Sequence, residues 1–446
     1  MGQYFGTDGI RGVANTELTP EFTLGLGRAV VRTLREEGVA RPQVLIGRDP
    51  RASGHMLEAA LAAGICSAGG DAILIGVVPT PAVAYLVPHL EVSSGAVISA
   101  SHNPVGDNGL KFFGPTGYKL TDAEEERIEE LLQLYDEFRP EGGAIGRVRE
   151  AHEAVAAYID HLVAVADADC SGLKVVVDCA NGAASGVAPR VLERLGCEVV
   201  ALCADPDGAN INVGCGSTHP ELMARAVVEH GADVGLAHDG DADRLIAADS
   251  AGNLVDGDAI LAILADREHR RRGLQTVVTT VMTNLGFTQA MQQRGIEVIQ
   301  TKVGDRYVLE AMRAGGHPLG GEQSGHLILA EHATTGDGVL SAVALLSALA
   351  DSGRSLSELA AIMTRLPQVL VNVSGVDRAS LDGAARLWAA VREAEQALDG
   401  SGRVLVRASG TEPLVRVMVE AESEERASEV AEQLAGVAAA ELTPTP

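Results

Sequence analysis

The sequence predicts an α/β protein built from several domains. Short runs of β-branched and other apolar residues alternate along the chain with longer stretches rich in Ala, Leu and Glu. Nearly continuous apolar runs are typical of strands that are buried on both faces of a parallel sheet. The strand–turn–helix unit recurs about every 25–35 residues, as crossover connections do. The length of 446 residues, at about 150 per domain, predicts roughly three domains and allows four.

The apolar runs define the predicted strands, which include residues 43–47, 72–78, 96–99, 174–178, 199–203, 234–238, 276–281 and 298–300. A helix is predicted over residues 124–138, and the glycine-rich connector after it interrupts the alternation. The helix predicted over residues 339–349 ends in a turn, and a linker follows around Pro367. These interruptions divide the chain into four predicted domains: residues 1–150, 151–255, 256–366 and 367–446.

The C-terminal segment has a different order of elements. It is predicted to form strand 369–373, helix 378–398, strands 403–407 and 414–420, and helix 424–441. Two consecutive strands joined by a short loop favour an antiparallel pair. We therefore expect a smaller α+β domain after three α/β domains.

The charge of the chain limits its partners. Lys and Arg number 35 and Asp and Glu number 61, which gives a formal net charge of −26. Nucleic acids and anionic membrane surfaces are bound by clustered Lys and Arg, so neither is expected as the main partner. Only four basic residues are lysines: Lys111, Lys119, Lys174 and Lys302. A lysine kept in so arginine-rich a sequence is a candidate for a role that arginine cannot fill.

The sequence also indicates a cytoplasmic protein. Its N-terminus lacks the basic and apolar regions of a secretory signal, and its six cysteines include no CxxC pair. The longest stretch without Asp, Glu, Lys or Arg, residues 72–90, is interrupted by three prolines. That stretch is therefore predicted to hold a short buried strand rather than a membrane span.

Ser101 and His102 lie in a loop directly after the predicted strand 96–99. Reacting groups sit at strand ends in parallel sheets, so Ser101 could be a nucleophile beside an acid/base group. Pro104 restricts the residue before it to extended conformations and fixes the loop. No G-x-S-x-G pattern occurs in the chain, which argues against a hydrolase nucleophile elbow. The alternative is a polar turn whose side chains make only local hydrogen bonds.

Three carboxylates follow another apolar strand at alternate positions: Asp239, Asp241 and Asp243. Oxygen ligands on a tight loop suit a hard cation, Mg²⁺ especially, which then fills its open positions with phosphate and water. An EF-hand is excluded because Arg244 stands where its turn glycine would be and Ser250 where its closing glutamate would be. The alternative is an acidic surface loop in an acidic protein.

The glycine-rich segment 320–326 contains Glu322, Ser324 and His326. Glycines allow the backbone to approach a ligand closely. The three polar side chains offer acceptor, donor and acid/base groups, which suit a polar ligand such as a sugar. The alternative is a glycine-rich turn whose histidine bonds to a neighbour.

A fourth loop joins the two consecutive C-terminal strands and contains Arg407, Ser409, Gly410, Thr411 and Arg416. Hydroxyls, backbone N–H groups and guanidinium groups are the donors from which phosphate sites are built. The alternative is a hairpin turn with two exposed arginines.

In combination, these loops resemble the signature motifs of the α-D-phosphohexomutase family. The strings GTDGIRG, SASHNP, DGDADR, GGEQSGH and RASGTEPLVRVM occur in the family's order along essentially the whole chain. The variants GTDGIRG and GGEQSGH look like the branch that acts on glucosamine phosphates. The resemblance implies an α/β architecture of four domains in a heart shape around a central cleft.

The resemblance also implies roles for single residues. Ser101 would carry a phosphoryl group and complete one Mg²⁺ site per chain with Asp239, Asp241 and Asp243. Lys111 would be the first candidate for the general acid/base, and His326 the second. The transferred group would be surrounded by Arg11, His102, Lys111 and Arg244. The sugar hydroxyls would be bound by Glu322, Ser324 and His326. The second phosphate would be bound by Arg407, Ser409, Gly410, Thr411 and Arg416.

In the reaction that the resemblance implies, phosphoserine donates its phosphoryl group to O1 of glucosamine 6-phosphate. Glucosamine 1,6-bisphosphate, the intermediate and activator, then returns its other phosphoryl group to the serine. Glucosamine 1-phosphate would leave and feed UDP-N-acetylglucosamine synthesis. The partner would be a small phosphosugar, and a homodimer is left open. The alternatives are phosphomannomutase or phosphoglucomutase activity, and a non-catalytic phosphosugar-binding relative.

Overall fold

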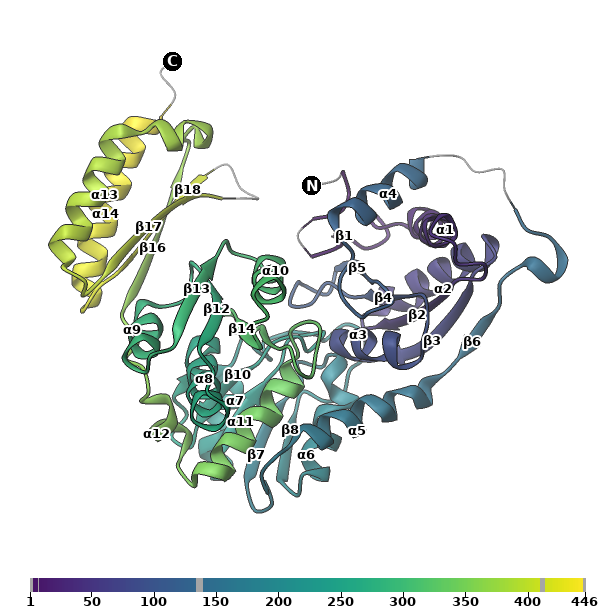
Figure 1. Cartoon of the computed structure of the whole chain (residues 1–446), viewed down its shortest axis with the longest axis horizontal. Coiled ribbons are helices and arrows are strands. Elements are labelled where there is room, and N and C mark those ends of the chain that lie inside the picture. Colours follow the sequence, from purple (N-terminus) through teal and green to yellow (C-terminus); the bar gives the residue numbers. More distant parts are fainter. Residues whose placement is uncertain (1–2, 7, 134–138, 410–413, 444–446) are drawn as a thin grey trace. The chain divides into compact units, whose positions relative to one another are not determined.

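The computed structural model describes residues 3–6, 8–133, 139–409 and 414–443. It forms two compact units. The large unit comprises Met1–Thr280 and Ile299–Ala361, and the small unit comprises Val281–Val298 and Ile362–Pro446. Figure 1 shows the helices and strands of each unit.

The first sheet of the large unit is mixed. Its strands, in spatial order, are β1 (Ile10–Val13), β5 (Asp107–Phe113), β4 (Ser94–Ile98), β2 (Gln43–Arg48), β3 (Asp71–Val77) and β6 (Val148–Glu150). Strands β4, β2, β3 and β6 pair in parallel, as the apolar runs predict for the first three of them. Strand β5 is antiparallel to both β4 and β1. The apolar-run pattern does not predict β5, because its first residues are polar.

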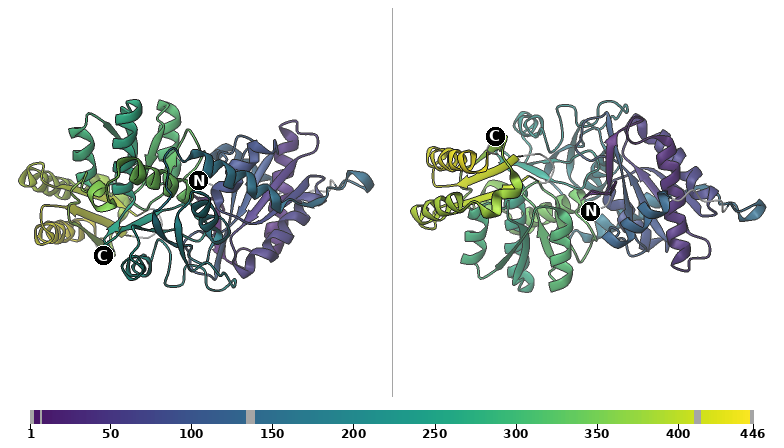
Figure 2. Two further views of the ribbon diagram at one scale, coloured as in Figure 1. Left: turned by 90° about the horizontal axis from the view of Figure 1, so that it is seen from below. Right: turned by 90° about the horizontal axis from the view of Figure 1, so that it is seen from above.

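Helices cover both faces of this sheet (Figure 2). They are α1 (Pro20–Glu36), α2 (Ala52–Ser67), α3 (Thr80–His89) and α4 (Asp122–Gln133). Val44 and Ile46 join the core formed with α1 and α2, and because side chains alternate along a strand, Gly47 faces the other side. A Cβ added to Gly47 would lie 2.6 Å from Val83 of α3. The glycine therefore allows α3 to pack directly on β2.

The second sheet has the order β11 (Leu254–Val255), β10 (Ile246–Asp249), β9 (Val234–Ala237), β7 (Lys174–Asp178) and β8 (Glu198–Leu202). Its helices are α5 (Val155–Val165), α6 (Ala188–Arg194) and α7 (Glu221–His230). Strand β7 pairs in parallel with β8 and β9, whereas β10 is antiparallel to β9 and β11. The loops that follow Asp178, Leu202 and Ala237 therefore leave the sheet at one edge.

The third sheet has the order β13 (Glu297–Thr301), β12 (Thr276–Thr280), β14 (Leu319–Gly321) and β15 (Leu327–Leu329). The helices of this part of the chain are α8 (Gly257–Arg272), α9 (Leu285–Gln293), α10 (Asp305–Gly315), α11 (Gly338–Ser352) and α12 (Leu356–Ala360). The Asp337 side chain caps α11 by accepting from Leu340 N at 2.9 Å. Among the described residues, no helix has both the length and the apolar content needed to cross a membrane.

The small unit contains an antiparallel sheet of order β16 (Gln368–Ser374), β18 (Leu414–Glu420) and β17 (Arg403–Ala408). Helices α13 (Ala385–Leu398) and α14 (Glu424–Leu442) lie on one face of this sheet (Figure 1), and their apolar residues form its core. The prediction of one helix over residues 378–398 is wrong at its start. Residues Arg378–Gly383 form a separate 3₁₀ turn capped by Asp377, and the non-helical backbone of Ala384 divides it from α13.

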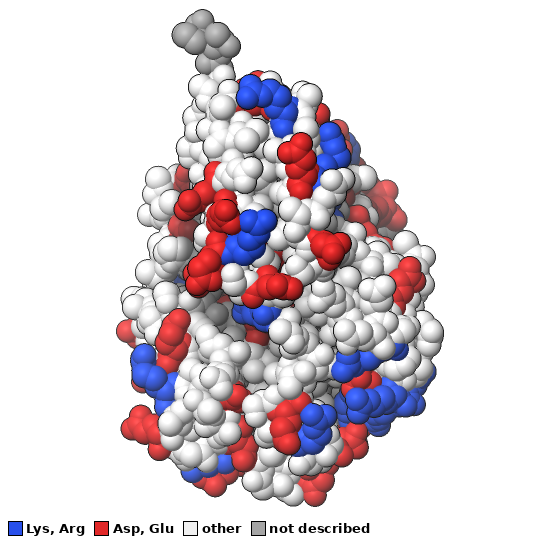
Figure 3. Space-filling model, turned by 90° about the vertical axis from the view of Figure 1, so that its left-hand side faces the viewer, with Lys and Arg blue, Asp and Glu red and all other residues white. Residues whose placement is uncertain are grey.

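The α/β class and the smaller α+β segment at the C-terminus are thus confirmed. The helix predicted over residues 124–138 corresponds to α4, and residues 134–138 lie outside the described residues. The four domain boundaries stay a prediction. Figure 3 shows one face of the molecule, on which acidic and basic side chains are interspersed rather than gathered by sign.

Candidate active site

Ser101 lies in the loop that follows β4, at the edge where the parallel strands of the first sheet end. The residue is 1% exposed. Its φ of +51° is in the left-handed region, which is uncommon for residues other than glycine and tends to occur at functional sites when the surroundings hold it. Contacts with neighbouring residues are therefore needed to stabilise this conformation.

A buried arginine supports the serine loop. The guanidinium of Arg51 donates to the carbonyl oxygens of Ser101 at 2.9 Å and Asn103 at 2.8 Å. Arg51 is itself paired with Asp49 at 2.9 Å, and both side chains are completely buried. Asp49 also accepts from Ser99 Oγ at 2.6 Å, and Ser99 Oγ accepts from Ser101 N at 2.9 Å. The ion pair thus fixes the loop from two sides.

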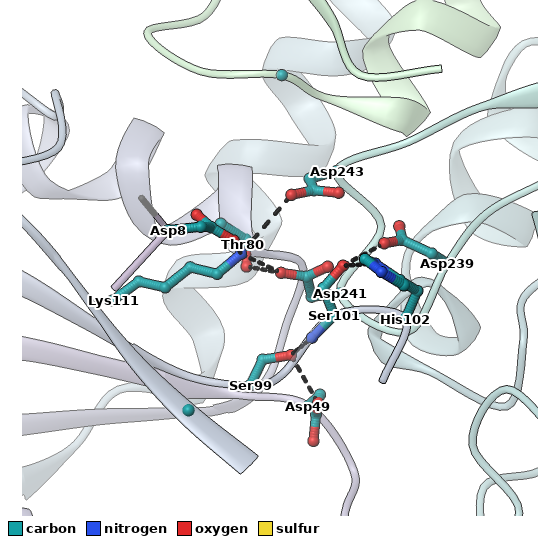
Figure 4. Close-up of polar contacts among 12 residues, drawn as sticks. Asp8, Asp49, Thr80, Ser99, Ser101, His102, Lys111, Asp239, Asp241 and Asp243 are labelled. Carbon is teal, nitrogen blue, oxygen red and sulfur yellow. Dashed lines mark hydrogen bonds and ion pairs between the residues drawn. The ribbon is translucent and has the colours of Figure 1, made fainter. Parts of the chain in front are cut away.

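The three predicted metal ligands lie next to Ser101 (Figure 4). Asp239, Asp241 and Asp243 follow β9, and Ser101 Oγ donates to Asp239 Oδ2 at 2.5 Å. The two loops can approach this closely because the residue after Asp239 is glycine. A Cβ added to Gly240 would lie 2.5 Å from the Ser101 carbonyl oxygen.

The three carboxylates fit a hard divalent cation. One oxygen from each of Asp239, Asp241 and Asp243 lies within 4.8 Å of the others, and all three residues are buried. Burial, together with repulsion from Asp243 and Asp241, holds the pKa of Asp239 well above its usual value. Asp241 Oδ1 and Asp243 Oδ1 are buried and have no hydrogen-bond partner among the described residues. Buried carboxylate oxygens without a hydrogen-bond partner are suited to bind Mg²⁺.

Lys111 neutralises part of this negative charge (Figure 4). Its Nζ lies 2.9 Å from Asp241 Oδ2, 2.9 Å from Asp8 Oδ2 and 3.7 Å from Asp243 Oδ2. Burial alone would lower the pKa of Lys111, but Asp241, Asp8 and Asp243 outweigh it and raise the pKa. Lys111 is therefore a buried, charged ammonium group held beside the carboxylates.

Arg11 enters the site from β1, which pairs with the strand of Lys111. Its guanidinium lies 2.5 Å from Asp8 and 3.1 Å from Asn103 Oδ1. Asp8 also contacts Lys119, which bridges to Asp305 at the start of α10. The pKa of Asp8 is held well below its usual range, because Lys111, Lys119 and Arg11 outweigh its burial.

His102 and Arg244 complete the surroundings of the serine. His102 Nδ1 lies 3.2 Å from Ser101 Oγ. Burial, with Arg244 and Arg11 nearby, lowers the pKa of His102 to about 4, so the ring is uncharged at neutral pH. Burial would lower the pKa of Arg244 as well, but the neighbouring Asp243 and Asp239 raise it.

The predicted sugar loop connects β14 and β15, and it contacts the carboxylates. His326 Nδ1 lies 3.6 Å from Asp243 Oδ2. The Asp243 and Asp305 carboxylates raise the pKa of His326 despite its burial. Glu322 accepts from Gly304 N at 3.2 Å. Ser324 Oγ is buried without a hydrogen-bond partner among the described residues, which leaves this hydroxyl available to a ligand.

The predicted phosphate loop lies in the small unit. Arg407 of β17 and Arg416 of β18 are directly opposite each other in the antiparallel register, so their side chains share one face of the sheet. Burial and the charge of Arg416 lower the pKa of Arg407. Ser409 is buried, and its carbonyl oxygen accepts from Arg378 at 2.9 Å. Gly410 and Thr411 lie outside the described residues.

The large unit therefore brings together predicted residues from three loops and from strands β1 and β5. They are Arg11, Ser101, His102, Lys111, Asp239, Asp241, Asp243, Arg244, Glu322, Ser324 and His326. Several residues to which the sequence assigned no role in the site contact these residues or one another: Asp8, Asp49, Arg51, Thr80, Lys119 and Asp305. Of these, only Lys119 stood out in the sequence, as one of four lysines. Asp49 and Arg51 could have been suggested by their position directly after β2, at the same edge of the sheet as Ser101.

Comparison with known families extends over most of the chain. The models of the phosphoglucomutase/phosphomannomutase alpha/beta/alpha domains I, II and III match residues 2–139, 156–252 and 256–366. The model of the phosphoglucomutase/phosphomannomutase C-terminal domain matches residues 370–437. All four matches occur in the order in which the family's domains are numbered.

Individual proteins give the same result. The phosphoglucosamine mutase of Streptomyces griseus is 55% identical over 446 residues, which cover 98% of this chain and 99% of that protein. The crystal structure of a phosphoglucomutase/phosphomannomutase family protein from Burkholderia thailandensis has a TM-score of 0.82 at 26% identity, covering 97% of this chain and 96% of that one. The N-acetylphosphoglucosamine mutase of Aspergillus fumigatus, solved with GlcNAc-6P and magnesium, has a TM-score of 0.69 at 19% identity, covering 99% and 96%. This last likeness concerns the fold alone.

Proposed function

The chain belongs to the phosphoglucomutase/phosphomannomutase family, and we propose that it interconverts glucosamine 6-phosphate and glucosamine 1-phosphate. The observation that carries the chemistry is the hydroxyl of Ser101, 2.5 Å from one carboxylate of a buried acidic triad and flanked by buried cations. The choice of substrate is supported by the full-length relative, 55% identical, that carries the name phosphoglucosamine mutase. The enzyme is thus an intramolecular phosphotransferase of amino sugar metabolism.

Ser101 carries the phosphoryl group between the two ends of the sugar. The Oγ–P bond of phosphoserine breaks while a P–O1 bond forms with glucosamine 6-phosphate. The proton of the O1 hydroxyl passes to a base, and the departing Ser101 Oγ takes up a proton. The resulting glucosamine 1,6-bisphosphate reverses its orientation and returns the phosphoryl group on O6 to Ser101 Oγ, which loses its proton. A proton returns to O6, and glucosamine 1-phosphate leaves with the phosphoryl group on O1.

The cations around Ser101 bind the group in transit. Arg11 and Arg244 supply fixed positive charge, which stabilises the phosphoryl oxygens as charge shifts between them. Lys111 is held as a charged ammonium group, so we assign it the donation of a proton to the departing oxygen, with His326 as the second candidate for the general acid/base. His102, uncharged and 3.2 Å from Ser101 Oγ, orients the phosphoserine side chain.

Asp239, Asp241 and Asp243 would hold one Mg²⁺ together with a phosphoryl oxygen of Ser101. When bound, the ion neutralises negative charge on the phosphoryl group. Thr80 acts on this cage from α3, because its hydroxyl donates to Asp241 Oδ2 at 2.6 Å and thereby orients that carboxylate. We treat Thr80 as a positioning residue.

The remaining contacts hold the sugar. Glu322, Ser324 and His326 bind the hydroxyl and amino groups of the ring. The phosphate that is not being transferred is bound by Arg407, Ser409, Gly410, Thr411 and Arg416. The cytoplasmic location, the homodimer and the role of glucosamine 1,6-bisphosphate as activator stay predictions.

Two measurements test the proposed function. The intact mass of the purified chain should show one phosphoryl group that is absent from Ser101→Ala. The value of kcat/KM should be highest for glucosamine 6-phosphate among the 6-phosphates of glucosamine, glucose and mannose. A higher value for glucose or mannose would move the protein to another branch of the family. Lack of both phosphoserine and turnover would make it a non-catalytic binder.

A further inference from the structure

A second group of potential metal ligands lies at strand ends of the second sheet, and it shares no residue with the acidic triad. Asp178 ends β7, Cys203 directly follows β8, and Cys215 lies in the loop before α7. One carboxylate oxygen and the two sulfur atoms all lie within 4.8 Å of one another.

The backbone holds these side chains in place. Asp178 Oδ1 accepts from Ala180 N at 2.8 Å, and Asp178 Oδ2 accepts from Gly216 N at 2.9 Å. Cys203 adopts a φ of +46°, an uncommon conformation for a residue with a side chain. Asp178 and Cys215 are buried and Cys203 is half-buried. The cluster is therefore fixed in position and accessible from the Cys203 side.

We propose that Asp178, Cys203 and Cys215 form a second metal site, which binds a thiophilic divalent cation such as Zn²⁺. Two thiolates and a carboxylate are ligands that zinc accepts, and three protein ligands leave a fourth position for water. Soft sulfur ligands distinguish this site from the all-oxygen cage of Asp239, Asp241 and Asp243, which suits Mg²⁺. The Ala180 and Gly216 N–H groups would act as the outer partners that orient a ligating carboxylate.

A divalent cation at this position would favour the thiolate forms of Cys203 and Cys215 and compensate the Asp178 carboxylate. Two protons would be released as the two sulfur–metal bonds form.

The site is connected to the reacting serine. The segment between Cys203 and Cys215 carries Asn212, whose side-chain amide donates to the carbonyl oxygen of Ser101 at 2.9 Å. Asn212 N also donates to Ala180 O at 2.9 Å. A cation bound by Cys203 and Cys215 would restrain the segment between them. It would thereby stabilise the hydrogen bond from Asn212 to the Ser101 backbone. The site would therefore stabilise the loop that supports the phosphoserine.

Cobalt provides a specific probe, since a thiolate bound to Co²⁺ gives a charge-transfer band in the near ultraviolet and an oxygen ligand does not. The reduced, chelator-treated full chain is titrated with Co²⁺ in excess Mg²⁺, which keeps the acidic triad occupied. We expect the band in the wild-type chain and its loss in Cys203→Ser. Cys66→Ser is the matched control, because Cys66 is also half-buried but lies on α2, and it should keep the band.

Thermal unfolding provides the second measurement. Zn²⁺ should raise the Tm of the wild-type chain and of Cys66→Ser but not that of Cys203→Ser, and Cys203→Ala should repeat the result. Turnover of Cys203→Ser in Mg²⁺ should equal that of the wild type, so this test is independent of the proposed function. No thiolate–cobalt band, a band that survives Cys203→Ser, or a Cys203–Cys215 disulfide in place of metal binding would overturn the proposal.

Discussion

The two regions assigned to phosphate chemistry differ in the signs of the charges that they place side by side. In the reacting centre of the large unit, defined as Ser101, Lys111 and the three carboxylates, the buried ammonium group contacts carboxylates at 2.9–3.7 Å. In the phosphate loop of the small unit, defined as residues 407–416, Arg407 and Arg416 occupy directly opposite positions on paired strands. Opposite charges therefore surround the serine, whereas like charges adjoin in the phosphate loop.

This difference indicates different tasks. Compensated charges hold the reacting centre in one geometry before substrate arrives, which is what phosphoryl transfer requires. Like charges directly opposite each other on a sheet repel, and this repulsion favours the binding of an anion beside them. A bound phosphate would relieve that repulsion and gain charge-assisted hydrogen bonds. We expect substitutions in the first region to change turnover or stability, and substitutions in the second to change binding.

The largest effect is expected for Ser101→Ala, which removes the acceptor of the phosphoryl group. Turnover should fall by at least about 10⁴-fold, because the covalent route is lost. Affinity for glucosamine 6-phosphate, measured by calorimetry, should stay close to that of the wild type, since the binding groups remain. Full turnover by the Ala variant would contradict the assignment of the serine.

Arg51→Ala should have the next largest effect, on stability. It leaves the Asp49 carboxyl group completely buried without its partner, which should lower the free energy of unfolding by about 3–5 kcal/mol. The matched control is Arg41→Ala, which breaks another Arg–Asp pair of the same sheet, at 2.8 Å but on the surface. The free energy of unfolding of that variant should fall by no more than about 1 kcal/mol. Urea unfolding followed by circular dichroism measures the stability of both variants. Equal decreases in the free energy of unfolding would mean that the buried pair does not support the loop.

Asp241→Asn removes one ligand of the proposed Mg²⁺ cage and a partner of Lys111. Turnover at saturating Mg²⁺ should fall by about 100-fold or more, as expected when a metal that stabilises transferred charge is displaced. The Mg²⁺ concentration for half-maximal activity should rise in the same titration. An unchanged titration would show that the carboxylate does not bind the ion.

The sequence predicted the residues whose signal is local. Ser101, Asp239, Asp241 and Asp243 each follow an apolar strand, and their residue types and spacing are visible within a few positions. The contact of Arg51 with Ser101 joins residues 50 positions apart, and nothing beside Arg51 distinguishes it from an arginine in a turn. Such a role depends on which strand ends meet, and that is decided by the packing of the whole sheet.

The antiparallel strand β5 of the first sheet was missed for a related reason, although the antiparallel pair of the C-terminal segment was predicted. Strand β5 begins with Asp107 and Asn108, so it lacks the continuous apolar run by which the parallel strands were recognised. Its pairing with β1 and β4 nevertheless places Lys111 beside the carboxylates. The motif around Lys111 was identified by family resemblance, whereas the strand that positions it follows only from the three-dimensional structure.

In the small unit, Arg416→Ala should weaken binding rather than chemistry. Loss of a charged hydrogen bond to phosphate costs about 1.5–3 kcal/mol, which corresponds to a rise in KM of about 10–100-fold. The phosphoryl group on Ser101 should remain in the intact mass. Arg426→Ala is the control, because Arg426 pairs with Glu429 on the exposed face of α14, and its KM should not change. A fall in kcat alone would make the phosphate loop part of the chemistry and remove the contrast between the two regions.

The smallest effect is expected for Thr80→Val, which keeps the size of the side chain and removes the 2.6 Å hydrogen bond to Asp241 Oδ2. Because outer partners of a metal ligand typically change metal affinity by about 10–100-fold, we expect a Mg²⁺ requirement about 10-fold higher. Thr80→Ser, which restores the hydroxyl, should return the Mg²⁺ requirement to the wild-type value.

Since Thr80 touches no substrate group, KM for glucosamine 6-phosphate at saturating Mg²⁺ should stay constant. A change in KM without a change in Mg²⁺ requirement would place Thr80 outside the cage, and the reacting centre would then be less tightly organised than its contacts indicate.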